Sequence, residues 1–220
     1  MRVVLLHLPP SGREAPAAAL AEALEVRRIF IGDLIRFHLS RRTELGIRAA
    51  EIMDSGSLLP DDLITAMVRD RLQRADLADF LLEGHLLSPA QALALDSLLH
   101  ELGKPLDAVV LFHLPPDEVE RRIRRQAARR ICCNDCSHVF EPETDSFVAA
   151  DLCDVCRGEL FQREDDKEHN IRRRFDSYEA MVKPITWHYA RQRLLVTVDA
   201  VGTTDETIGR AITALREHRR

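Results

Sequence analysis

Short hydrophobic runs alternate along the chain with longer segments of helical periodicity. Buried strands are expected at residues 3–6, 27–31, 79–83, 107–114 and 194–198. Helices are expected at residues 15–24, 90–103, 117–130, 165–192 and 204–216. Strands that alternate with helices predict parallel strands joined by right-handed crossovers, and therefore a doubly wound α/β sheet. Ligands of such sheets bind beyond the carboxyl ends of the strands.

A longer helical segment, residues 33–72, separates the second predicted strand from the third. Its pattern is interrupted at Gly46 and at Ser55–Gly56, and a turn is expected around Pro60. We therefore expect several short helices here rather than one long helix.

Composition narrows the class of protein. The 220 residues are 45% hydrophobic and 30% charged, with a formal net charge of -5. This balance is ordinary for a globular domain and argues against a general nucleic-acid binder, whose domain is usually basic. The hydrophobic run at residues 1–8 meets Pro9–Pro10 and is too short for a signal peptide, and no stretch approaches membrane-spanning length. We expect a cytoplasmic protein without nucleic-acid or membrane partners.

Four cysteines are spaced as ligands of a structural metal ion. Cys133 and Cys136 form one Cys-x-x-Cys pair, Cys153 and Cys156 form a second, and 16 residues separate the pairs. Two such pairs complete a tetrahedron of thiolates, which favours zinc. Cys132 is a spare thiol that competes with Cys133 for the first position. A closed four-sulfur site has no open coordination position, so we expect zinc to be structural.

Sequence motifs along nearly the whole chain resemble the adenylate kinase family, of the kind with a zinc-bearing lid. These motifs are Gly32–Arg36, Glu51–Gly56, Leu59–Asp61, Phe80–Gly84, Gln91–Ala92, Arg129–Cys132, Gln162–Asp166, Arg174 and Tyr178.

The resemblance implies a P-loop NTPase-like fold with two insertions. The α/β core would comprise residues 1–30, 61–121 and 161–220. Residues 31–60 would form a helical insertion that binds the nucleoside monophosphate, and residues 122–160 would form a small zinc-ribbon lid. The family also implies a monomer whose ligands are nucleotides.

The resemblance further implies roles for individual residues. Arg36 matches the arginine on the monophosphate, Gln91 matches the glutamine that reads the adenine of AMP, and Glu83 stands where an aspartate orients Mg²⁺. Four arginines match those of the lid and hinge that surround the transferring phosphoryl group: Arg125, Arg129, Arg163 and Arg174. Cations around the equatorial oxygens are what phosphoryl transfer requires, and arginine binds phosphate through two N–H groups.

The phosphate-binding loop departs from the family pattern Gly-x-x-x-x-Gly-Lys-Gly-Thr. In the segment from His7 to Ala15, only Gly12 of the fixed residues remains. Pro10 removes a backbone N–H from the phosphate cradle, and Arg13 keeps the charge of the lysine but not its shape. Glu14 places a carboxylate where phosphates would bind, which costs about 4 kcal/mol at 4 Å and surface-like dielectric. Ala15 lacks the hydroxyl that binds Mg²⁺.

A second departure lies after the third predicted strand. Gly84–Ser88 matches the family's Gly-Phe/Tyr-Pro-Arg-Thr, and Leu87 stands in place of its arginine. Loss of one such charge costs about 10³-fold in rate in other phosphoryl-transfer enzymes.

Three functions remain open on the sequence. One is an adenylate kinase-like phosphotransferase, ATP plus AMP to two ADP with Mg²⁺, of weak or altered activity. Another is a catalytically inactive relative that binds nucleotides or a protein partner, with AMP-side binding better retained than ATP-side binding. In a third, His7, His85 and Arg13 form a new anion or metal site, although the structural interpretation of both histidines is favoured.

Overall fold

The computed structural model describes residues 1–7, 15–74, 77–129, 131–133, 139–140, 152–153, 155–162 and 167–218. The chain divides into two compact units. The first, here called the sheet unit, reaches from the N-terminus to His113 and resumes at Glu179. The second, the lobe unit, contains Leu114–Tyr178.

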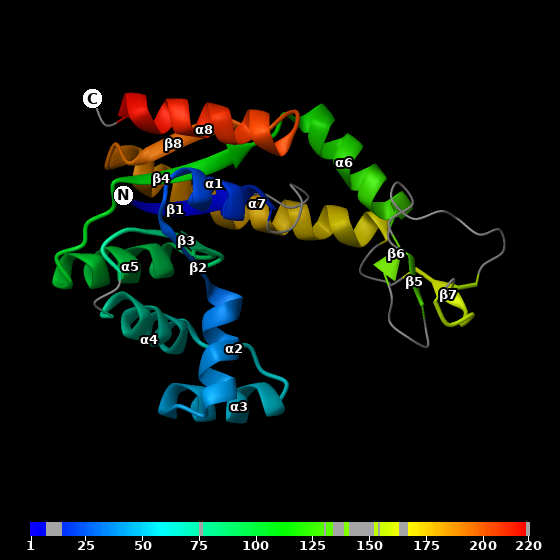
Figure 1. Ribbon diagram of the computed structural model, residues 1–220, viewed down its shortest axis with the longest axis horizontal. Helices are drawn as coiled ribbons and strands as arrows, with labels where there is room; N and C mark the ends of the chain where they lie inside the picture. The colour runs from blue at the N-terminus through cyan, green and yellow to red at the C-terminus, as the bar shows by residue number, and fades with distance from the viewer. Residues whose placement is uncertain are drawn as a thin grey trace. The chain divides into compact units, whose positions relative to one another are not determined.

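A five-stranded parallel sheet forms the centre of the sheet unit (Figure 1), which confirms the predicted fold class. Its strands lie in the order β2-β3-β1-β4-β8. Their bounds are β1 (Arg2–His7), β2 (Arg27–Phe30), β3 (Phe80–Glu83), β4 (Ala108–His113) and β8 (Leu195–Asp199). All five strands coincide with the hydrophobic runs of the sequence, with shifts of at most one residue at their ends.

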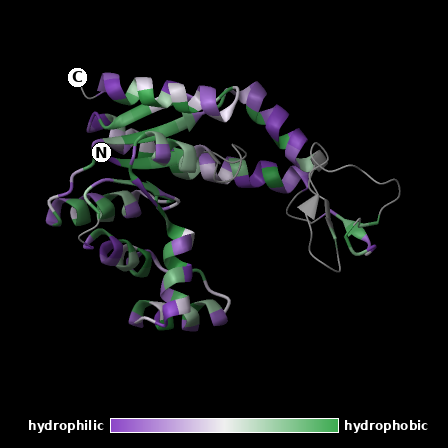
Figure 2. Cartoon of the chain, viewed as in Figure 1, coloured by the Kyte–Doolittle hydropathy of each residue, from purple (hydrophilic) through white to green (hydrophobic). Residues whose placement is uncertain are grey.

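Strand β1 is the middle strand and has no solvent-facing side. Val4 pairs with Leu82 of β3 and with Val109 of β4, and all three side chains are fully buried. A strand buried on both faces is expected to be continuously hydrophobic rather than alternating, as β1 is. Figure 2 shows the same concentration of hydrophobic residues in the strands of this sheet.

Helices connect the parallel strands as the sequence predicts. Helices α1 (Ala15–Ala23), α5 (Pro89–Glu101) and α7 (Glu168–Arg191) lie on connections between strands, and α8 (Thr204–His218) follows the last strand. Right-handed crossovers place α1 on one face of the sheet and α5 on the other, and α8 packs against α1. Among the described helices, none has the length and hydrophobicity needed to span a bilayer.

Three short helices fill the segment between β2 and β3: α2 (Ile31–Arg41), α3 (Glu44–Asp54) and α4 (Asp61–Leu72). They enclose a small hydrophobic cluster around Ala49, Leu63 and Met67.

The predicted break at Gly46 is wrong. The break falls at Arg42–Thr43, where Thr43 caps α3 by accepting a hydrogen bond from the Gly46 N–H at 3.1 Å. A Cβ at Gly46 would clash with the carbonyl group of His38. The glycine therefore permits close packing of α3 on α2 and does not end a helix.

The lobe unit contains α6 (Pro116–Arg129), the first part of α7 and a small antiparallel sheet. That sheet has β5 (Ile131–Cys133) between β6 (Val139–Phe140) and β7 (Leu160–Phe161). Helix α6 is mostly hydrophilic (Figure 2); it forms ion pairs such as Arg172–Glu120 and buries Val119 and Ile123.

Asp96 joins α5 to the C-terminal part of α7. Its carboxylate accepts hydrogen bonds from the Tyr189 hydroxyl at 3.1 Å and from Gln192 at 3.0 Å, and it lies 2.7 Å from His188 Nε2. Tyr189 is fully buried. Burial, and then the neighbouring Asp96 carboxylate, raises the pKa of the Tyr189 phenol well above its usual range.

We predict that Asp96→Ala lowers the free energy of unfolding by about 2–4 kcal/mol, because the buried Tyr189 hydroxyl loses its acceptor. Chemical denaturation measured by circular dichroism provides the test. The control is Glu101→Ala on the same helix, whose partly exposed pair with Arg69 at 2.7 Å is expected to contribute less than about 1 kcal/mol. Equal effects of the two substitutions would show that Asp96 does not hold α7 to α5.

Candidate functional site

The carboxyl edge of the parallel sheet brings together the ends of three neighbouring strands. Strand β2 ends at Phe30, β3 at Glu83 and β1 at His7, and Phe30 is paired with Glu83 in the register of β2 and β3. The altered phosphate loop follows β1 directly. Its residues Gly12, Arg13 and Glu14 lie outside the described residues, so their predicted roles stay predictions.

Glu83 is buried at this edge and forms an ion pair with Arg28 of β2. The Arg28 Nε donates a hydrogen bond to Glu83 Oε2 at 2.8 Å, and Nη2 lies 2.7 Å from the same oxygen. Nη2 makes no well-aligned hydrogen bond with the described residues. Nε therefore carries the hydrogen bond, while Nη2 adds positive charge. Glu83 is only 2% exposed, so a counter-charge within the fold is needed to keep it ionised.

Phe30 lies between two arginines at the end of β2. Its ring centroid is 5.4 Å from Arg28 Cζ and 6.0 Å from Arg36 Cζ, which is within cation–π range for both. A Cβ placed on Gly84 would be 3.2 Å from the Phe30 ring. Arg36, the predicted phosphate ligand, is exposed and pairs with Asp33 at 2.6 Å. Arg36 thus remains accessible to an anion.

Gln91 is held by both ends of its side-chain amide. Its Oε1 accepts a hydrogen bond from the Leu87 N–H at 2.6 Å, and its Nε2 donates to Asp61 Oδ1 at 2.6 Å. Ser88, the N-cap of α5, donates from its hydroxyl to the other Asp61 oxygen at 3.4 Å. Because the Leu87 contact uses the backbone, the missing arginine side chain at this position does not disturb Gln91. A primary amide keeps one further donor and one further acceptor in this arrangement.

His85 is buried beside these groups without a hydrogen bond. It is 2% exposed, and neither ring nitrogen has a partner among the described residues. Burial lowers the pKa of His85 to about 4, and the nearby Asp61 carboxylate opposes this shift only in part. The ring is therefore neutral at pH 7, and within the described residues it forms no anion site.

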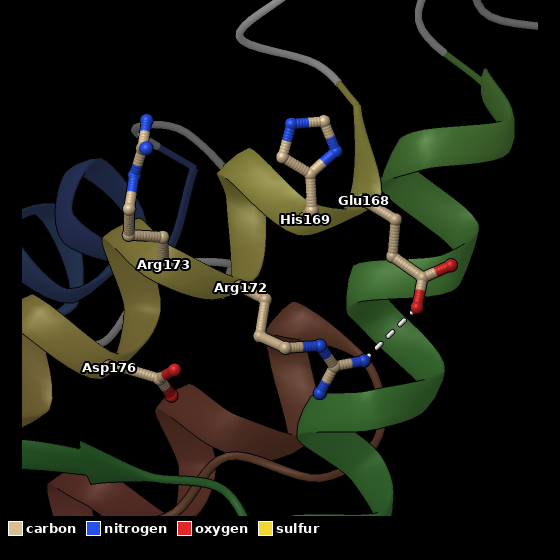
Figure 3. Close-up of a pocket in the computed structure, with 5 residues that line it drawn as sticks. All are labelled: Glu168, His169, Arg172, Arg173 and Asp176. Carbon is tan, nitrogen blue, oxygen red and sulfur yellow. Dashed lines mark hydrogen bonds and ion pairs between the residues drawn. The ribbon is translucent and has the colours of Figure 1, made fainter.

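The lobe unit has its own polar cluster along α6 and α7. Arg172 pairs with Glu120 of α6 and with Glu168 of α7, at 3.0 Å for the latter, and its hydrogen bond lowers the pKa of Glu120. The pair with Glu168 is drawn in Figure 3, beside an open cleft of about 440 Å³ that is also lined by His169, Arg173 and Asp176. These contacts tie together the two helices that flank the small antiparallel sheet.

The predicted lid arginines are only partly described. Arg125 lies exposed on α6, and Arg174 lies exposed on α7. The side chain of Arg129 and all of Arg163 lie outside the described residues. The catalytic roles of the four arginines therefore stay predictions.

Three of the four predicted metal ligands come together in the lobe unit. The sulfur atoms of Cys133, Cys153 and Cys156 all lie within 4.8 Å of one another, and those of Cys133 and Cys156 are 3.3 Å apart. A tetrahedral site with Zn–S bonds of about 2.3 Å separates its sulfurs by about 3.8 Å, so this cluster fits a thiolate-bound metal. Cys136 lies outside the described residues.

A tight turn brings Cys153 and Cys156 to the same side of the chain. The Arg157 N–H donates to the Cys153 carbonyl at 2.8 Å, the Cys153 N–H donates to the Gly158 carbonyl at 2.9 Å, and Arg157 has a positive φ of 65°. Cys133 and Cys153 are buried against Leu160. Local backbone geometry thus brings Cys153 and Cys156 together, and the pairing of Cys133 with Leu160 adds the third sulfur.

Sequence reasoning missed two residues of the sheet-unit site, Arg28 and Asp61, as partners of predicted ones. Two adjacent basic residues, Arg27–Arg28, inside a strand of a buried sheet are the signal for the first, because a charge there needs a partner. Asp61 belonged to a quoted motif, but its contact with Gln91 joins residues 30 positions apart.

The sheet order and the lobe inserted between β4 and β8 define a P-loop-type α/β kinase fold. A family profile described as adenylate kinase matches residues 5–194. The adenylate kinase of Streptomyces avermitilis is 43% identical over 98% of this chain and 97% of its own length. That of Acidothermus cellulolyticus is 41% identical over 98% of both chains, and that of Alkaliphilus oremlandii is 36% identical over 98% of both. The chain belongs to the adenylate kinase family.

We predict that the purified protein contains one zinc ion per chain, measured by elemental analysis. Cys153→Ser and Cys133→Ser should both lose the metal, because each removes a thiolate of the described cluster. Cys132→Ser is the matched control and should retain it. Loss of zinc in Cys132→Ser with retention in Cys133→Ser would reverse the assignment of the first ligand.

We predict that His85 makes the fold sensitive to acid. The pKa of His85 is about 4 in the folded protein and near 6.5 when unfolded, so the unfolded state binds more protons between these values. Stability falls as the pH drops through this window, by about 2 kcal/mol between pH 7.5 and pH 5. His85→Phe should remove that share of the acid sensitivity, measured by urea denaturation at each pH.

The control for this prediction is His100→Gln, at an exposed histidine of α5, which should follow the wild-type pH dependence. If His85→Phe loses as much stability as the wild type between the two pH values, the buried imidazole is not the sensitive group.

Proposed function

We propose that this chain catalyses phosphoryl exchange between ATP and AMP to give two ADP, at a rate well below that expected of an intact phosphate loop. Membership of the adenylate kinase family supports the reaction class. The reduced rate is our proposal from the residues at the sites of chemistry.

The observation that carries this function is the anchored amide of Gln91. With Leu87 N–H and Asp61 fixing its two ends, the amide has one acceptor and one donor left. The Watson–Crick edge of adenine offers the complementary pair, an amino donor and a ring-nitrogen acceptor. We propose that Gln91 reads the base of AMP and that the exposed Arg36 binds its phosphate.

The ATP side is proposed to be the weaker half. Pro10 lacks a backbone N–H that would bind phosphate, and Ala15 lacks the hydroxyl that binds Mg²⁺. Glu14 adds a negative charge where the polyphosphate would bind. Gly12 and Arg13 retain part of the cradle. AMP binding is therefore expected to be better retained than ATP binding.

Transfer itself requires little from the protein beyond position and charge. The bond from the γ-phosphorus to the β,γ-bridging oxygen breaks as a phosphate oxygen of AMP forms the new bond. Arg13, Arg125, Arg129, Arg163 and Arg174 are proposed to neutralise the three equatorial oxygens. Leu87 contributes no charge, so one cation of the family arrangement is missing.

The proposal also assigns a role to each part of the chain. We assign residues 31–60 to the monophosphate-binding insertion, residues 122–160 to a zinc-binding lid and the remainder to the core. The cysteine cluster supports a structural zinc in the lid. The protein is proposed to act as a monomer.

Magnesium is expected to arrive bound to ATP, as adenylate kinases use it. The protein groups that would meet it do not fit that role here: Ala15 has no hydroxyl, and Glu83 is paired with Arg28. Loss of these contacts favours a second candidate, an inactive relative that binds AMP and acts through a partner.

We predict that the rate of ADP formation from ATP and AMP lies at least about 10³-fold below that of the Streptomyces avermitilis adenylate kinase under the same conditions, in line with losing one arginine. An enzyme-coupled assay measures it. Calorimetry should show tighter binding of AMP than of ATP with Mg²⁺. A normal rate would refute the reduced-activity proposal, and an undetectable rate with intact AMP binding would favour the inactive relative.

A matched set of variants separates the two halves of the site. Arg13→Lys, Glu14→Gly, Ala15→Thr and Leu87→Arg introduced together should raise the rate, because they restore the family residues that bind phosphate and Mg²⁺. The same four substitutions with Gln91→Ala should weaken AMP binding and lose that gain. No rise in the fourfold variant would place the defect elsewhere.

A further inference from the structure

The buried carboxylate at the end of β3 already has a cation. Glu83 receives the Arg28 Nε hydrogen bond at 2.8 Å and has Nη2 at 2.7 Å from the same oxygen. With Glu83 only 2% exposed, the guanidinium lies on the carboxylate where a hydrated ion would otherwise approach. An ion pair in such surroundings is stronger than one in water, because the local dielectric is low.

The register of the strands explains why Arg28 reaches this oxygen. Arg28 is paired with Leu81, and Phe30 is paired with Glu83. Alternate residues of a strand share a face, so Arg28 and Phe30 project to the same side of β2. The Arg28 side chain therefore runs along the strand by one residue pair to meet Glu83.

Phe30 holds the guanidinium in this place. The ring centroid is 5.4 Å from Arg28 Cζ, and the ring is confined on its other sides by Gly32 and Gly84, where a Cβ would lie 2.7 Å and 3.2 Å from it. Arg28 thus has two independent contacts, one ionic and one with an aromatic face. A guanidinium suits both geometries, and an ammonium suits them less well.

We propose that Arg28 is a positioning residue that takes the place of a divalent cation at Glu83, so that the protein contributes little to metal binding at this edge. The inference deepens the proposed function, because it assigns the metal requirement of the site to the nucleotide alone. Glu83 then serves to fix Arg28.

The test uses Mn²⁺ alone as the probe, with the zinc-loaded full chain, and measures bound Mn²⁺ by electron paramagnetic resonance. Wild type should show weak binding that Glu83→Gln leaves unchanged. Arg28→Gln should tighten Mn²⁺ binding by about tenfold or more, the size of effect expected on removing one unit charge next to a cation site. The double variant Arg28→Gln with Glu83→Gln should lose that gain.

Two further variants provide controls. Arg28→Lys keeps the charge and should bind Mn²⁺ as weakly as wild type. Arg27→Gln removes an exposed charge from the same strand and should change nothing.

Three outcomes would overturn the inference. They are a wild-type Mn²⁺ site that Glu83→Gln abolishes, an unchanged affinity in Arg28→Gln, and equal gains in Arg28→Gln and Arg27→Gln. If Arg28→Gln does not fold, the Mn²⁺ affinities of Glu83→Gln and the wild type provide the test alone, because Glu83→Gln removes the carboxylate and keeps Arg28. Mn²⁺ binding needs no turnover, so an absent kinase activity would refute the proposed function and leave this result standing.

Discussion

The burial of β1 between β3 and β4 is the constraint on which the site depends. Val3, Val4, Leu5 and Leu6 are almost completely buried, and their backbone groups pair with strands on both sides. A shift of β1 by one residue would turn each of these side chains to the opposite face and leave backbone groups in the core unpaired. Because this register is fixed, the chain must leave the sheet at His7, next to the end of β3. The end of β1 at His7, and Glu83 and Gly84 at the end of β3, are thus placed by packing, whatever chemistry their side chains perform.

Burial also determines which charged side chains can lie at this edge of the sheet. A carboxylate at the end of a fully buried strand cannot remain ionised without a partner, and Arg28 provides one from the neighbouring strand. Removing either member alone takes away a charge partner of the other, so the two substitutions are expected to be non-additive. His85 illustrates the alternative outcome. Its nitrogens have no partner among the described residues, and burial lowers the pKa of the imidazole, so that the ring is neutral in the core.

The strands and helices were predictable because each has a strong local signal: continuous hydrophobic runs for the parallel strands, and helical periodicity closed by turn residues. Gly46 misled because a glycine that permits close helix packing has the same sequence appearance as one that ends a helix. Candidate ligands such as Gln91 and Cys153 were predictable from motifs. Asp61, the partner of Gln91, and Arg28, the partner of Glu83, were not predictable, since these contacts join residues 30 and 55 positions apart and the second depends on the strand register.

The altered phosphate loop and the stability of the fold need not conflict. Bare glycines before a helix bind phosphate well but carry a cost in conformational entropy, and their replacement generally stabilises a protein. In this chain Glu14 precedes α1, Ala15 begins it and Pro16 follows, and all three residue types favour a helix N-terminus. The substitutions that we propose to weaken a polyphosphate site are therefore ones that a helix accepts readily. Such replacements leave the sheet and the anchored Gln91 intact, because burial and hydrogen bonds within the fold maintain both, and neither depends on ATP.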